Sequence, residues 1–185
     1  MNGKINQIKK LIKEECSANG SEWFYSVHLL GVEKFANELL KKLPKANKEI
    51  VMLGVWLHDL QRVRKIEGSH AKVGAAEAEK MLIQFGHGQE TIARVKEIIL
   101  THSCDCGLAP KTPEGKILAT ADAMSHFSND FYLAVAITGK RDAKSFKKWA
   151  LEKIERDYNK KIFFGFARKI IARRYKILKD FLIVE

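Results

Sequence analysis

The sequence predicts an all-α protein, and three observations support this fold class. Apolar residues recur at three- and four-residue spacings through most of the 185 residues, which is the period of a helix. No segment of useful length alternates apolar and polar residues, as a half-buried strand would. No internal repeat or low-complexity linker divides the chain. We therefore expect a single-domain helical bundle that spans residues 1–185.

The first helices follow from apolar spacing and from the residues that can begin or end a helix. The N-terminal helix is amphipathic, and its apolar face contains Ile5, Ile8, Leu11 and Ile12. The second covers residues 21–43, because Ser21 can cap a helix and Pro44 ends one. The third covers residues 46–60 and contains an apolar run that indicates burial.

Turn residues separate the remaining helices. Gly68-Ser69 precedes a helix over residues 70–85, and Gly86-His87-Gly88 separates it from the next. Two prolines and a glycine predict a loop over residues 103–113. The other helices are expected at residues 89–102, 114–128, 130–138, 143–159 and 161–182.

The composition is that of a globular protein without membrane spans or a disulfide framework. Hydrophobic residues make up 46% and charged residues 30% of the chain. No apolar run reaches the roughly 18 residues that span a bilayer, and the N-terminus lacks the apolar core of a secretory signal. The three cysteines, Cys16, Cys104 and Cys106, are too few for a framework of disulfides. We expect a cytoplasmic protein with no membrane partner.

The net charge of +11 comes from the C-terminal quarter. Residues 140–179 hold 15 Lys/Arg and 4 Asp/Glu, whereas the rest of the chain holds 18 of each and is neutral. This imbalance favours an anionic partner, which would be a nucleotide, a polyphosphate or a nucleic acid. A pair of solvated helices whose lysines keep the protein soluble would give the same pattern.

The dipeptide His58-Asp59 follows the eight uncharged residues Ile50 to Leu57 without a break. A helix made of that run is expected to be buried, so it carries an imidazole and a carboxylate into the interior. An ionised carboxylate is costly to bury unless a partner or a metal compensates it. The dipeptide therefore predicts a divalent metal ion in the helical core.

Other titratable residues lie on apolar helix faces by the same spacing argument: His28, His70, His102 and Asp122. Helix bundles build metal sites from inward side chains on facing helices. A single inward histidine is more often a hydrogen-bonded core residue, but four histidines beside two aspartates are hard to explain in that way. This nitrogen and oxygen set suits Mn, Fe, Co, Ni or Mg, and Zn also accepts it.

The order His28, His58-Asp59, Asp122 resembles the HD-domain superfamily of metal-dependent phosphohydrolases. Four segments between about residues 23 and 127 carry the resemblance, namely His58 to Arg62, Ser69 to Ala75, Ile98 to His102, and Lys116 to Asp122. The resemblance implies an all-α fold in which His28, His58, Asp59 and Asp122 surround one metal ion. In relatives with two ions, the aspartate that matches Asp59 bridges them, and the histidines that match His70 and His102 complete the second site.

Two features depart from the family pattern. Gln61 stands where many members carry glycine. The interval from Asp59 to His70 is shorter than in several two-metal relatives, so the sequence does not choose between one ion and two.

A bound divalent ion would lower the pKa of a coordinated water and polarise a phosphoryl oxygen. Asp59 and Arg62 are the expected catalytic residues, because Arg62 matches a basic position of the family. The candidate contacts to a small anionic phosphorylated substrate are Arg62, Arg64, Lys65, Lys116 and His126. A surface basic turn is the alternative for Arg64 and Lys65, and a packed position behind the metal ligands is the alternative for His126.

The expected function is therefore a metal-dependent phosphohydrolase that cleaves phosphate or pyrophosphate from a small substrate, with a nucleotide as the favoured class. One alternative is an HD-type di-iron oxygenase, which needs both His70 and His102 as ligands. Another is a non-catalytic, metal-stabilised protein that binds nucleic acid or a nucleotide through residues 140–179. A separate zinc or redox site at Cys104-Asp105-Cys106 is a weaker hypothesis, because no second cysteine pair exists. The oligomeric state is left open.

Overall fold

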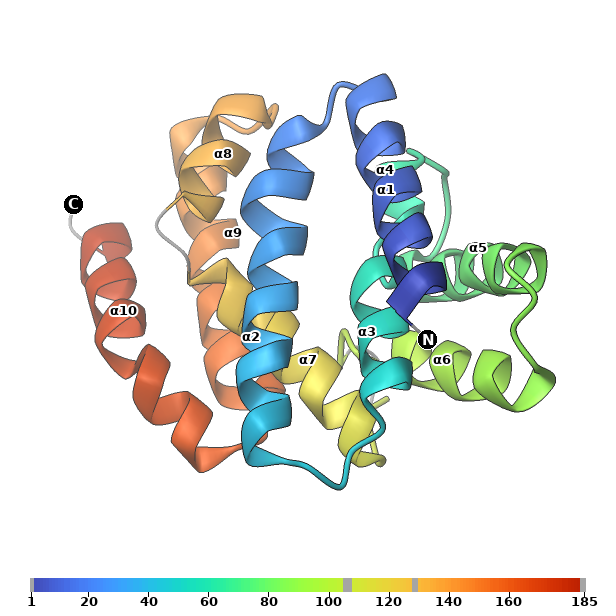
Figure 1. The fold of residues 1–185 in the computed structure, drawn as a ribbon. Helices are drawn as coiled ribbons and strands as arrows, with labels where there is room; N and C mark the ends of the chain where they lie inside the picture. The colour runs from blue at the N-terminus through green and yellow to red at the C-terminus, as the bar shows by residue number, and fades with distance from the viewer. Residues whose placement is uncertain (1, 105–107, 128–129, 184–185) are drawn as a thin grey trace.

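The computed structural model describes residues 2–104, 108–127 and 130–183, and helices make up its secondary structure (Figure 1). No strand occurs within these ranges, so the all-α prediction is confirmed. Two of the elements are π-helices, η1 and η2. The elements in chain order are α1 (Asn2–Ala18), η1 (Phe24–Leu29), α2 (Leu30–Lys42), α3 (Lys48–Leu57), α4 (Leu60–Val63), α5 (His70–Gln84), α6 (Gln89–Thr101), α7 (Pro113–His126), α8 (Phe131–Thr138), α9 (Ala143–Arg156), η2 (Asp157–Lys161) and α10 (Gly165–Ile183).

Helix α3 is the buried centre of the fold. Every residue from Ile50 to Leu57 is buried, and α1, α2, α5, α6 and α7 all contact this helix. Glycines permit the closest approaches: a Cβ at Gly54 would lie 2.5 Å from Ile98 of α6, and one at Gly74 of α5 would lie 3.0 Å from the carbonyl oxygen of His58. The interior that the apolar run predicted is therefore also the place where α5 and α6 meet the His-Asp dipeptide.

The helix expected over residues 46–60 is shorter than these bounds and ends with its apolar run at Leu57. Asn47 caps α3 by accepting a hydrogen bond from the backbone N–H of Ile50, and the helix stops at Leu57. Asp59 leaves the helical conformation, with φ −111° and ψ 21°, and a single turn of α4 follows it. The dipeptide thus lies at a junction between two helices, which turns the Asp59 carboxylate away from the axis of α3.

Helix α7 is almost entirely buried and packs along α2. Its start was expected at residue 114 and is found at Pro113, where the missing N–H of proline costs nothing. Thr112 caps the helix by accepting a hydrogen bond from the N–H of Gly115. At Gly31 the helix α2 comes so close to Ser125 of α7 that an added Cβ would lie 3.2 Å from its Cβ.

The C-terminal helices depart from the expected boundaries. The helix expected over residues 143–159 ends as α9 at Arg156 and continues as η2, and α10 begins at Gly165 instead of residue 161. A π-helix has a wider turn than an α-helix and is often found at functional sites. Helix α9 packs on α10, and η2 contacts α7 (Figure 1). Among the described helices, none combines the length and the apolar character that crossing a membrane requires.

Candidate metal centre

Four residues from three separate parts of the chain converge in the interior, namely His28 of η1, His58 and Asp59 at the α3–α4 junction, and Asp122 of α7. None of them is more than 5% exposed. The Nε2 atom of His28 lies 3.1 Å from Oδ2 of Asp59 and 3.5 Å from Oδ1 of Asp122. The Nε2 atom of His58 lies 3.4 Å and 3.8 Å from the same two oxygens. The structure therefore brings together the four residues to which the resemblance assigns one metal ion.

Hydrogen bonds at Nδ1 orient the histidines of this cluster. His58 donates from Nδ1 to the carbonyl oxygen of Val55, at 2.9 Å. The hydroxyl of Ser125 donates to the carbonyl oxygen of Asp122 at 2.7 Å, so it accepts from Nδ1 of His28 at 3.0 Å. In both histidines, Nε2 is then the atom that faces the carboxylates.

This arrangement fits a cation. Nitrogen lone pairs and carboxylate oxygens face one another at 3.1 to 3.8 Å. Buried Nε2 of His58 has no hydrogen-bond partner among the described residues. An unpaired buried acceptor is costly, and a divalent ion shared with the facing carboxylates would satisfy it. His28, His58 and Asp122 each offer an atom within 4.8 Å of the others, which is the spread that a single ion can bridge.

A second group of ligand atoms lies on the other side of Asp59. His70, at the start of α5, places Nε2 2.8 Å from Oδ1 of Asp59 and 3.2 Å from Nε2 of His102. His102 ends α6 and donates from Nδ1 to the carbonyl oxygen of Ile99. His58, Asp59 and His102 also lie within 4.8 Å of one another. The short interval from Asp59 to His70 therefore does not keep His70 away from the cluster.

The electrostatics favour neutral histidines beside ionised carboxylates. Burial lowers the pKa of His28, and burial together with the neighbouring His58 lowers that of His102 to about 3. Burial alone would raise the pKa of Asp59, but His58 and His70 hold it well below its usual value. Asp59 in turn raises the pKa of His58, against the effect of burial. Metal binding needs deprotonated ligands, and of His28, His58 and His102 it is His58 whose neighbours raise the pKa and so favour the protonated form.

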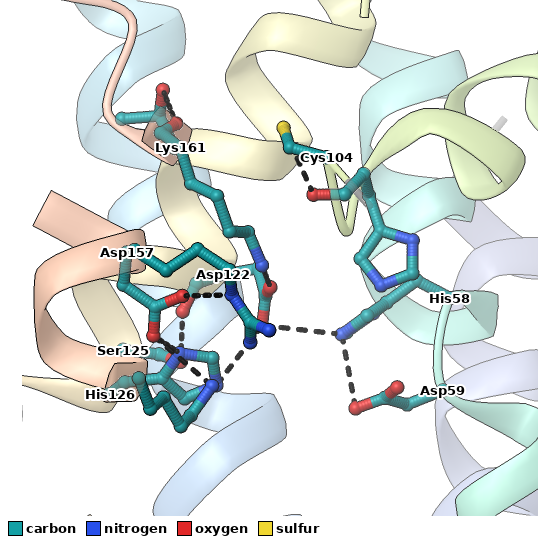
Figure 2. A network of polar contacts seen from close by, with 12 residues as sticks. His58, Asp59, Cys104, Asp122, Ser125, His126, Asp157 and Lys161 are labelled. Atoms are coloured by element: carbon teal, nitrogen blue, oxygen red, sulfur yellow. Dashed lines mark hydrogen bonds and ion pairs between the residues drawn. The ribbon is translucent and has the colours of Figure 1, made fainter. Parts of the chain in front are cut away.

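The buried polar residues Asp157 and Lys161 of the C-terminal part were not predicted from the sequence. Figure 2 shows them on the opposite side of Asp122 from His58 and Asp59. Lys161 donates from Nζ to Oδ2 of Asp122. Asp157 accepts from Nδ1 of His126 at 2.8 Å and pairs with Lys153 at 3.1 Å. Nε2 of His126 lies 3.3 Å from Oδ1 of Asp122.

These C-terminal groups carry opposite charges in the interior. Burial disfavours the charged form of Lys161, but Asp122 and Asp157 raise its pKa. Burial and the neighbouring Lys153 lower the pKa of His126 to about 3, so its ring is neutral. This neutral ring stacks parallel to that of His28, with centroids 5.1 Å apart. Lys161 of η2 thus balances the carboxylate of Asp122 directly.

The ligand cluster opens into a cavity of about 440 Å³. The metal-ligand candidates His28, Asp59, His70, His102 and Asp122 line one part of it. The rest of the wall is basic and aromatic, and includes Arg62, Arg141, Lys153, Arg156, Lys161, Trp23, Phe131 and Trp149. A molecule in the cavity would therefore meet the ligand cluster and a positively charged surface together.

The structure separates the predicted substrate contacts into two groups. Arg62 and His126 line the cavity, and Nε of Arg62 lies 3.4 Å from Oδ1 of Asp59. Arg64, Lys65 and Lys116 do not line it. Helix α4 is a single turn, so the chain has already turned away from the site at Arg64.

The side chains of the second group have other partners or positions. Arg64 forms ion pairs of 2.7 Å with Glu15 and Glu77, and so ties α4 to α1 and α5. Lys65 donates to the carbonyl oxygen of Asn19. Lys116 is half-buried near the start of α7, away from the cavity. These three residues therefore lie away from the cavity, and a contact between them and substrate stays a prediction. For the zinc or redox hypothesis, Asp105 and Cys106 lie outside the described residues.

Comparisons with known proteins identify the family and support the fold. The HD domain family model matches residues 25–126, which include all six candidate ligands and none of the basic residues from 140 to 179. A protein from Bacillus thuringiensis described as an HD-superfamily hydrolase superposes with a TM-score of 0.69 at 17% identity, over 98% of this chain and 94% of that one. A predicted HD superfamily hydrolase from an uncultured Thermotogales bacterium superposes with a TM-score of 0.64 at 23% identity, over 96% and 88%. The search of curated proteins gives no match. The family model spans more than half of the sequence, and the chain belongs to the HD-domain family.

Proposed function

We propose that this protein is a metal-dependent phosphohydrolase that acts on a small phosphorylated compound, with a nucleotide as the favoured class. The observation that carries the proposal is a buried cluster of histidine and aspartate ligands beside a cavity with a basic wall. Both solved structures described above are named HD-superfamily hydrolases. A metal-dependent hydrolase of phosphate esters or anhydrides uses a metal-activated water together with positive charge that pairs with the phosphoryl oxygens.

In this proposal, one group of residues holds the metal ion and another pairs with the substrate. A divalent ion held by His28, His58, Asp59 and Asp122 would supply a water of lowered pKa and would polarise a phosphoryl oxygen. Arg62 and Lys153 line the cavity and can pair with the substrate's anionic oxygens.

Aromatic side chains favour a nucleotide within this class. Trp23, Phe131 and Trp149 line the same cavity as the ligand cluster, and such rings can pack against a nucleobase. The cavity volume also lies in the range of sites for molecules of nucleotide size. The test is a panel of nucleotides and other phosphorylated compounds with Mn, Co, Ni or Mg, in which released phosphate and pyrophosphate are measured. Failure to hydrolyse any member with any of these metals would contradict the proposal.

Arg62 and Arg64 offer a matched pair of substitutions for the same assay. Arg62→Ala is expected to raise KM about tenfold or more, because a charge-assisted contact to phosphate contributes about 1.5–3 kcal/mol. Arg64→Ala is expected to leave KM unchanged and to lower the urea midpoint of unfolding, because Arg64 pairs with Glu15 and Glu77. If the two substitutions changed KM equally, Arg62 would have no specific contact with the substrate.

An HD-type di-iron oxygenase is the second candidate. It needs six ligands, and the positions of His70 and His102 beside Asp59 meet that requirement. Metal analysis separates the candidates, because one ion per chain would exclude a di-iron centre.

A further inference from the structure

Lys161 binds one carboxylate oxygen of Asp122, which is a proposed metal ligand. Its side chain is 3% exposed, and its ammonium donates to Oδ2 of Asp122. The other oxygen, Oδ1, faces Nε2 of His28 at 3.5 Å and Nε2 of His58 at 3.8 Å. The two oxygens of one buried carboxylate therefore face two different places, the ligand cluster and a lysine from outside the family-matched residues.

The main chain holds this lysine in place. Thr120, which is fully buried in α7, donates from its hydroxyl to the carbonyl oxygen of Lys161 at 3.3 Å. The same hydroxyl accepts from the N–H of Phe163 at 3.1 Å. Thr120 lies two residues before Asp122, so the segment that carries Lys161 is tied to the segment that carries its partner. Lys161 is thus a fixed part of the interior and not a mobile surface side chain.

The positive charge of Lys161 affects both the stability of the Asp122 carboxylate and the binding of a metal ion to it. Without a cation, a buried carboxylate would be destabilising, and Lys161 supplies that cation. A divalent ion at the ligand cluster would bring a second cation to the same carboxylate. Like charges a few ångströms apart repel strongly in a poorly hydrated interior.

We propose that Lys161 is a built-in counter-ion of Asp122, which keeps the metal-free protein folded and weakens the binding of a divalent metal. The proposal rests on the metal centre of the proposed function and does not depend on hydrolysis. Its test therefore uses metal binding and folding, which remain measurable if no substrate is ever cleaved.

The experiment compares wild-type protein with Lys161→Met, Lys161→Arg and Lys153→Met. The Kd for Mn²⁺ is measured by titration calorimetry, and the unfolding midpoint is measured in EDTA and in excess Mn²⁺. Lys153→Met is the control, because Lys153 is a largely buried lysine, 11% exposed, whose ion pair is with Asp157. We expect Lys161→Met to bind Mn²⁺ about tenfold tighter or more, and to gain more stability from Mn²⁺ than the wild type. Lys161→Arg keeps the charge and is expected to stay near the wild type.

The folding and the Mn²⁺ affinity of Lys161→Met either support or overturn the proposal. A Lys161→Met protein that folds only with Mn²⁺ supports the proposal, because the metal then replaces the missing counter-ion. A folded variant that binds Mn²⁺ no tighter than the wild type overturns it. So does a variant that stays unfolded in excess Mn²⁺, or a Lys153→Met control that tightens binding to the same extent.

Discussion

Asp59→Ala is expected to abolish phosphate release, with kcat reduced by at least about 1,000-fold. Asp59 faces both groups of ligand atoms, with its Oδ2 3.1 Å from Nε2 of His28 and its Oδ1 2.8 Å from Nε2 of His70. Its loss removes an anionic ligand from every candidate ion position. The measurement is the steady-state rate with the best substrate of the phosphorylated-compound panel, at saturating metal.

The control for this substitution is Asp180→Ala. Asp180 is exposed on α10 and pairs with Lys176, so the rate of this variant should equal that of the wild type. Circular dichroism should show that both variants are folded. An Asp59→Ala protein that keeps a tenth or more of the wild-type rate would refute the role of Asp59 and the metal-dependent mechanism with it.

Asp157→Ala is expected to cost about 3–5 kcal/mol in the free energy of unfolding, the range for breaking a buried ion pair. Asp157 is fully buried, and it accepts from His126 and pairs with Lys153. Its removal leaves the ammonium of Lys153 without this partner in a largely buried position. Urea unfolding monitored by tryptophan fluorescence measures the change.

Asp142→Ala provides the comparison, because Asp142 is an exposed helix cap at the start of α9. It should lose much less stability than Asp157→Ala. If the two variants lose the same amount, Asp157 has no special part in joining η2 to α7.

The ligand set was accessible from the sequence because each ligand follows a local rule. His28, His102 and Asp122 lie at helical spacing from apolar residues, and the apolar run before His58 indicates burial without any tertiary information. The resemblance to the HD-domain superfamily then implied which of these residues surround the same metal ion. Helical spacing gives the face on which a side chain lies, and the shared apolar core then brings these faces into contact.

The C-terminal contribution was not accessible in the same way. Residues 157–161 read as part of a basic amphipathic helix, and nothing local distinguishes Lys161 from its solvated neighbours. Only the packing of η2 on α7, with its wider π-helical turn, makes Asp157 and Lys161 point inward. The position of Arg64 was not predictable for a related reason, because closeness in sequence to Asp59 does not give closeness to the cavity when a one-turn helix intervenes.

The most direct test of the metal centre is anomalous diffraction from crystals grown with Mn²⁺. We expect a peak within coordination distance of His58 Nε2 and of carboxylate oxygens of Asp59 and Asp122, at the place where these buried acceptors now face one another. Crystals that show no peak among these three side chains, or place the ion at the protein surface, would contradict a metal centre in the helical core.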